Sequence, residues 1–268
     1  MKIRITPKPL AGQISAIPSK SHGHRLLICA ALGGAPEDAL VDIDSEDIHA
    51  TRDCLAALLA PSTKDAPTPI LPCRESGSTL RFLLPLALCC REKVTFTMKG
   101  RLPHRPLSPL KEELEAHGCC FSPLNQNGAL TQLTLSGKLQ GGTFSLPGNV
   151  SSQFITGLLF ALPLLPEGGK IQITTPLESK PYLDLTLKVL STFGIEIQEQ
   201  DNAYLVPGNQ RYCSPGKQRA EGDWSNLAFW ITANALGSSI TYTGGDLHSA
   251  QGDKAILSLL SSREIDGR

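Results

Sequence analysis

The chain has 268 residues, of which 41% are hydrophobic and 19% charged, and its formal net charge is zero. This composition is typical of globular proteins, and a chain of this length can bury a core without disulfides or metals. The neutral charge balance argues against a general nucleic-acid-binding protein, which needs an excess of basic residues.

The first five residues, Met1 to Ile5, alternate apolar and charged side chains, which predicts a strand and not a signal peptide. The longest apolar stretch runs from Phe154 to Leu165, is interrupted by Pro163 and is too short to span a bilayer. We therefore expect no nucleic-acid partner, no membrane association and a cytoplasmic location.

One pattern recurs four times along the chain: a small-residue loop opens an apolar helix. Each helix starts with Ser or Asp, which suits an N-cap, and its apolar body predicts burial on most sides. These helices begin near Ser19, Ser76, Val150 and Asp223.

A β-rich strand and a second helix follow each of these apolar helices. The predicted strands are Ala39–Ile43, Val94–Met98, Lys170–Thr174 and Ser239–Thr243. The predicted second helices are Asp47–Leu59, Leu107–His117, Tyr182–Phe193 and Gly252–Leu260. Units two and three each add two further strands, which in unit three are Ile195–Glu199 and Ala203–Val206.

The fourth unit has room for one short strand at most after its second helix. Apolar positions such as Ile256, Leu257 and Leu260 would then lack a full partner layer. We expect the chain to end within a repeat, the alternative being that this unit is a natural cap.

Three of the helix starts carry hydroxyls and cations, a combination that suits phosphate because free backbone N–H groups and the helix dipole attract anions. They are Ser19–Arg25, Glu75–Arg81 and Gly148–Gln153. Taken singly, each is better explained as a simple capped helix. Two more loops, Arg101–Pro106 and Ser179–Tyr182, add cations at corresponding ends of the units, which favours one anion-binding face.

No nucleophile motif or nucleotide-binding glycine motif is present. The eight cysteines form no C-x-x-C pair, which favours free thiols over a zinc site. We expect no metal and no cofactor.

In order along the chain, these segments resemble the EPSP synthase (3-phosphoshikimate 1-carboxyvinyltransferase) family. The segment SKSHGHR resembles the family's S-K-S-x-x-x-R loop, and ESGSTLR resembles N-A-G-T-x-x-R. The segments LPHRP, GNVSSQF, SKPYLDLTLKVLSTFG and EGDWSNLAFWITANAL resemble four further family segments. The resemblance covers the chain from end to end.

The resemblance implies an α/β (α+β) fold, the inside-out barrel of βαβαββ repeats, with substrates bound between two similar domains. It implies transfer of the enolpyruvyl group of phosphoenolpyruvate to the 5-hydroxyl of shikimate 3-phosphate, on the route to chorismate and the aromatic amino acids. It implies no cofactor, and we expect a monomer. We expect residues 22–219 to form a complete first domain of three βαβαββ units, with 1–21 and 220–268 in an incomplete second one.

The resemblance also assigns substrate contacts. Lys20 matches a lysine that touches both substrates, and Ser21 and Arg25 match residues on the shikimate carboxylate side. The phosphate cradle would be Ser151, Ser152 and Ser179, with Gln153 and Tyr182 lining the ring and Gln153 also near phosphoenolpyruvate. Gly77 and Arg105 match residues on the phosphoenolpyruvate side.

The chain departs from the family at Glu75, where the common residue is Asn, and at Ser78, which replaces Thr but keeps the hydroxyl. The family's acid/base residues and part of its anion clamp would lie beyond Arg268, so we expect little or no catalysis by this chain alone.

Two other functions stay open. One is a non-catalytic fragment that binds shikimate 3-phosphate. The other is the related enolpyruvyl transferase that acts on UDP-N-acetylglucosamine. The second is disfavoured because the first loop reads Lys20-Ser21 where that enzyme has Lys-Asn, and because Cys119 and Cys120 suit a strand and not its mobile loop.

Overall fold

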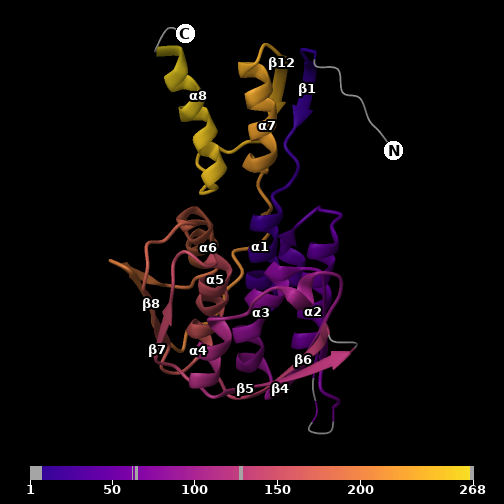
Figure 1. The fold of residues 1–268 in the computed structure, drawn as a ribbon, viewed down its shortest axis with the longest axis vertical. Helices are drawn as coiled ribbons and strands as arrows, with labels where there is room; N and C mark the ends of the chain where they lie inside the picture. The colour runs from indigo at the N-terminus through magenta and orange to yellow at the C-terminus, as the bar shows by residue number, and fades with distance from the viewer. Residues whose placement is uncertain (1–7, 62, 64–65, 127–128, 266–268) are drawn as a thin grey trace.

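The computed structural model describes residues 8–61, 63, 66–126 and 129–265. The predicted strand at Met1–Ile5 lies outside these ranges. The chain forms a large lobe and a small lobe (Figure 1). In the described ranges no helix has the length and apolarity that crossing a membrane requires.

The large lobe contains three units in chain order. The first comprises α1 (Lys20–Leu32), β2 (Ala39–Leu40) and α2 (Glu46–Leu59). The second comprises β3 (Ile70–Arg74), α3 (Gly77–Cys90), β4 (Lys93–Met98), α4 (Leu110–Ala116), β5 (Cys119–Gln126) and β6 (Ala129–Gly137). The third comprises β7 (Thr143–Leu146), α5 (Ser152–Ala161), β8 (Gly169–Ile173), α6 (Lys180–Thr192), β9 (Gln198–Gln200) and β10 (Ala203–Val206).

Units two and three have the same sheet topology, with strand orders β3-β4-β6-β5 and β7-β8-β10-β9. In each, the first pair is parallel and the other two pairs are antiparallel. This arrangement is the βαβαββ unit, and it occurs twice in the part of the chain that the structure describes.

The first unit has a smaller sheet: within the described ranges, β2 pairs with the short strand β11 (Gln218–Arg219) alone. Among the described residues, the first unit has no strands between α2 and the start of the second unit at β3. An apolar groove of about 610 Å³ lies between α1, β2 and α2, lined in part by Leu27, Leu55 and Leu59.

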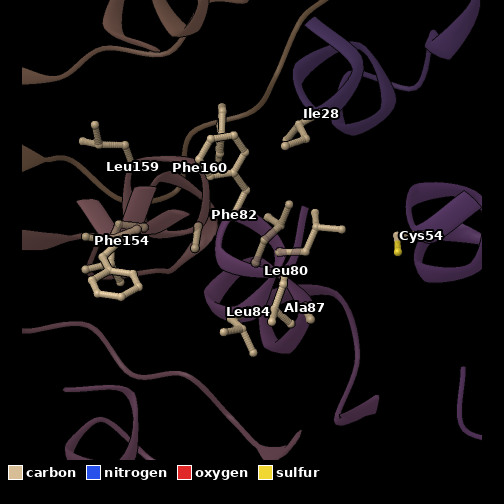
Figure 2. Packing of buried hydrophobic residues seen from close by; sticks show 14 of the residues in the cluster. Ile28, Cys54, Leu80, Phe82, Leu84, Ala87, Phe154, Leu159 and Phe160 are labelled. Carbon is tan, nitrogen blue, oxygen red and sulfur yellow. The ribbon is translucent and has the colours of Figure 1, made fainter. Parts of the chain in front are cut away.

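The helices α1, α3 and α5 form the centre of the large lobe, because their side chains are apolar on nearly every face. Figure 2 shows Phe82 of α3 beside Phe160 of α5, and their ring centroids are 5.7 Å apart in an edge-to-face arrangement. Helices buried on all sides must meet water only at their ends, so polar side chains gather at their first turns.

The small lobe consists of β1 (Ala11–Ser15), α7 (Trp224–Ala235), β12 (Ser239–Thr243) and α8 (Ile256–Ile265). The strands β1 and β12 are parallel, although 228 positions separate partners such as Ala11 and Ser239. Its buried cluster contains Trp224, Leu227 and Ile231, against which Ile256, Leu257 and Leu260 are partly buried. Other large apolar side chains of this lobe, including Phe229 and Leu236, are exposed.

Two segments connect the lobes and lie antiparallel. The N–H of Ser19 donates to the carbonyl of Glu221 (2.7 Å), and the N–H of Asp223 donates to that of Ile17 (2.8 Å). These bonds place the start of α1 directly beside the start of α7.

Candidate functional site

A cleft of about 360 Å³ lies where α1, α3, α5 and α6 begin. The free N–H groups and positive dipole ends of these helices make their first turns favourable for an anion. The lining residues are mostly polar and include no Asp or Glu: Ser21, His24, Arg25, Ser78, Arg81, Phe82, Val150, Ser151, Ser152, Gln153, Ser179 and Tyr182.

Capping determines which hydroxyls face the cleft. Ser19 and Ser76 are buried N-caps, whose Oγ atoms accept from the N–H groups of His22 (3.4 Å) and Thr79 (3.2 Å). The next hydroxyls along, Ser21 and Ser78, line the cleft.

In the third unit, Ser151 is both N-cap and lining residue, since its Oγ accepts from the N–H of Gln153 (3.3 Å). Ser179 precedes α6 and makes no side-chain capping bond. Its hydroxyl is therefore available to a ligand.

Arg25 is the buried cation of the cleft, with 3% of its surface exposed. Its Nε donates to Thr186 Oγ1 (2.8 Å), and its terminal nitrogens donate to the carbonyls of Ser21 (2.6 Å) and Tyr182 (2.9 Å). The guanidinium also lies 5.4 Å from the centre of the Phe82 ring. Burial lowers the pKa of Arg25 to about 10, so the group stays charged at neutral pH.

None of the ion pairs found in the described residues involves Arg25, and all its hydrogen-bond acceptors are neutral. A buried charge that neutral dipoles alone stabilise is strongly attracted to an anion.

Arg81 connects α3 to α5. One terminal nitrogen donates to Gln153 Oε1 (2.8 Å) and the other to the carbonyl of Pro106 (3.1 Å). Gln153 Nε2 in turn donates to Ser78 Oγ (2.9 Å). Burial, and next the charge of Arg105, lower the pKa of Arg81. Two guanidinium groups therefore lie close together beside this wall.

His24 is buried in the cleft lining, and its Nδ1 lies 2.8 Å from Thr51 Oγ1. Its ring meets Phe82 edge-to-face, with centroids 6.2 Å apart. Burial lowers the pKa of His24 to about 3, so the imidazole is neutral at physiological pH.

Seven of the ten residues predicted from the sequence line the cleft: Ser21, Arg25, Ser151, Ser152, Gln153, Ser179 and Tyr182. The other three are not lining residues. Lys20 is exposed and its Nζ pairs with Asp47 at 2.6 Å. Arg105 packs on Gly77, where a Cβ atom would stand 2.7 Å from its Nη1.

The sequence reasoning passed over His24, Ser78, Arg81, Phe82 and Val150 as ligand contacts. A signal for Arg81 was present, because it follows Gly77 by four residues and so lies one turn into the helix on the same side. His24 gave no signal, since its burial depends on α2 and α3.

The family model of EPSP synthase (3-phosphoshikimate 1-carboxyvinyltransferase) matches residues 5–265. The chain belongs to this family. A 3-phosphoshikimate 1-carboxyvinyltransferase of Clostridium perfringens is 42% identical over 275 residues, which cover 97% of this chain and 64% of that protein. One of Clostridium kluyveri is 40% identical over 279 residues, covering 98% and 64% respectively.

Solved structures agree on the fold. EPSP synthase from Acinetobacter baumannii superposes with a TM-score of 0.73 at 19% identity, over 96% of this chain and 60% of that one. The enolpyruvyl transferase NikO from Streptomyces tendae superposes with a TM-score of 0.63 at 14% identity, over 96% and 62%. The predicted fold of βαβαββ repeats is therefore confirmed. The chain spans a little under two thirds of the length of these relatives.

Proposed function

We propose that the cleft binds shikimate 3-phosphate and that the chain takes part in enolpyruvyl transfer from phosphoenolpyruvate to its 5-hydroxyl. The observation that carries this proposal is the buried Arg25, which has no ion pair among the described residues, in a cleft that is also lined by serines from four helix starts. A ligand that is anionic and bears several hydroxyls matches both features. The family membership and the names of the curated relatives support the same assignment.

The geometry supports one role for each wall of the cleft. Ser151, Ser152 and Ser179 would donate to the phosphate, with the free N–H groups at the start of α5 behind them. Arg25 and Ser21 would face the carboxylate. The neighbouring guanidinium groups of Arg81 and Arg105 favour a second anion, which fits phosphoenolpyruvate.

A second candidate function is binding without turnover. Two observations favour it: among the described residues no carboxylate lines the cleft, and the cleft histidine has too low a pKa to act as a base at neutral pH. The lining residues can hold anions but supply no group poised for proton transfer.

Calorimetry with shikimate 3-phosphate tests the binding proposal. Replacing Ser179 by Ala removes a hydroxyl that does not cap a helix, so the fold should be kept. A hydrogen bond to a charged group contributes roughly 1.5–3 kcal/mol, so S179A should weaken binding by about 10- to 100-fold.

Ser191→Ala is the matched control, an exposed serine in the last turn of the same helix, and its affinity should equal that of the parent chain. No binding by the parent, or equal binding of UDP-N-acetylglucosamine, would overturn the assignment. Phosphate release from phosphoenolpyruvate, measured in parallel, separates transfer from binding alone.

A further inference from the structure

One polar atom of a cleft-lining residue has no role in the function proposed so far. Nε2 of His24 is buried and has no hydrogen-bond partner among the described residues, whereas Nδ1 of the same ring contacts Thr51. Leaving a buried polar atom without a hydrogen bond costs free energy, because the atom gives up its bonds to water. When the residue that carries such an atom lines a ligand cleft, the atom is a candidate ligand contact.

The neighbouring hydrogen bonds indicate which ring nitrogen carries the proton. Thr79 Oγ1 lies 3.3 Å from the carbonyl of Asp47, which can only accept, and 2.7 Å from Ser76 Oγ. If the single Thr79 proton serves either contact, Thr51 must donate to Thr79 across their 2.7 Å separation. The Thr51 oxygen then accepts from Nδ1–H of His24.

This chain of donors leaves Nε2 as a bare lone pair. If the hydrogen bonds ran in the opposite direction, from Thr79 to Thr51 to Nδ1, the Asp47 carbonyl would lose its bond from Thr79, and an unpaired N–H would be buried at Nε2. The Nδ1–H tautomer therefore satisfies one more hydrogen bond. Burial keeps the ring neutral; the positive charges of Arg25 and Lys20 act in the same direction, and only the charge of Asp47 opposes it.

A bare lone pair differs in kind from the rest of the cleft. The arginines and serines can donate to phosphate or carboxylate oxygens, whereas Nε2 can only accept and would repel an anion. It can pair with a hydroxyl group that donates. Beyond its anionic groups, the ligand that the proposed function assigns to the cleft offers ring hydroxyls.

We propose that Nε2 of His24 accepts a hydrogen bond from a ring hydroxyl of the bound substrate, directly or through one water molecule. This makes His24 a specificity-determining residue that distinguishes hydroxylated from deoxygenated rings. The inference rests on the proposed function, because it takes the ligand from there. The hydrogen-bonded chain through Thr51 and Thr79 holds the ring in the required tautomer.

Two substitutions of His24 test the roles of its two ring nitrogens separately. His24→Asn keeps a donor near Nδ1 for Thr51 but has no acceptor near Nε2. His24→Gln places an amide oxygen near Nε2 and loses the donor at Nδ1. Calorimetry would compare shikimate 3-phosphate with analogues that each lack one ring hydroxyl, with heat-unfolding midpoints recorded for every variant.

We expect the parent chain to bind one deoxy analogue about 5- to 10-fold more weakly than shikimate 3-phosphate. H24N should bind shikimate 3-phosphate more weakly than the parent by the same factor, and it should bind the matching deoxy analogue as tightly as the parent does. H24Q should keep most of the difference in affinity between the two ligands. If H24N weakens both ligands equally, or neither, the inference is wrong.

The tautomer of His24 can be measured in the parent chain, so this test does not depend on whether the variants fold. Nitrogen-15 NMR of the parent chain should show the proton of His24 on Nδ1 at neutral pH, and shikimate 3-phosphate should shift the Nε2 resonance. A proton on Nε2 would overturn the inference. Failure of the parent to bind shikimate 3-phosphate would overturn the proposed function, and with it the assigned ligand.

Discussion

Arg25 illustrates how a residue can be both structural and functional. Its guanidinium holds α1 to α6 through Thr186 and the Tyr182 carbonyl, yet none of its partners is charged. Taking a cation out of water without a counter-ion is costly, and a bound anion would offset part of that cost. The cleft therefore favours an anion through a charge already fixed in place, with little reorganisation on binding.

His24 makes the stability of the chain depend on pH. In the unfolded chain its pKa is near the ordinary 6.5, whereas burial lowers it to about 3 in the fold. Between these values the unfolded state binds more protons, so acid favours unfolding. From pH 7 to pH 5, His24 alone should cost about 2 kcal/mol of the free energy of unfolding.

Urea unfolding at both pH values checks this, with H24Q as the control. The parent should lose more stability than H24Q on acidification, by about that amount. His22, whose pKa burial also lowers, contributes in the same direction and is present in both proteins. Equal losses in parent and variant would show that His24 is not buried as neutral imidazole.

At this scale the sequence predicted a site from hydroxyls and cations at helix starts, and seven of those residues line one cleft. The sequence could not reveal which of these polar groups form hydrogen bonds with other protein groups and are therefore not available to a ligand. Lys20 pairs with Asp47, which is 27 residues away and belongs to another helix. Only the packing of α1 on α2 and α3 shows that His24 is buried.

At the scale of elements, α3 and α5 pack closely against each other at Gly157. A Cβ atom at Gly157 of α5 would stand 2.5 Å from the carbonyl oxygen of Arg81 and 3.0 Å from Pro85 Cγ. Although Ala has the higher helix propensity, the clash is with backbone and cannot be relieved by a rotamer change. The glycine therefore sets the spacing of the two helices.

Gly157→Ala should lower the free energy of unfolding by about 1–3 kcal/mol, measured by urea titration. It should also weaken shikimate 3-phosphate binding, because separating the helices strains the bond from Arg81 to Gln153. Ser191→Ala, on the exposed surface of α6, should change stability by less than about 0.5 kcal/mol. An unchanged G157A protein would mean that the helices can separate freely.

The sequence predicted the existence and type of the repeated elements better than their ends. N-caps were read correctly at Ser19, Ser76 and Asp223, where a capping side chain sets the boundary. The helix predicted over Leu107–His117 begins only at Leu110, because Pro109 stands at its N-cap. The strand predicted over Ala39–Ile43 ends at Leu40, because its partner β11 has two residues.

On the scale of the whole molecule, the two lobes differ greatly in buried apolar surface. The large cluster draws on residues from Leu26 to Ala220, whereas the small lobe buries Trp224, Leu227 and Ile231. This contrast supports the proposed domain division at 22–219, with 1–21 and 220–268 forming the other part. A smaller core gives a lower local stability.

The two tryptophans, Trp224 and Trp230, both lie on α7 in the small lobe. Tryptophan fluorescence therefore reports on that lobe, while far-ultraviolet circular dichroism is dominated by the larger one. In urea the fluorescence change should come at a lower concentration than the dichroism change. Shikimate 3-phosphate should raise the midpoint of the second transition. Coincident transitions would show that the lobes unfold as one unit.

The two-stranded sheet of the first unit marks a place where the chain can change in length. The helix α2 contacts the cleft lining in its first half, where Thr51 pairs with His24. It ends at Leu59 after 14 residues, so its full length is roughly 21 Å. Units two and three each place a β-hairpin after the corresponding helix, β5-β6 and β9-β10. Evolution or an engineer could therefore attach a reporter domain, or add or remove a hairpin, just after α2 while leaving the ligand chemistry at the opposite end of the helix intact.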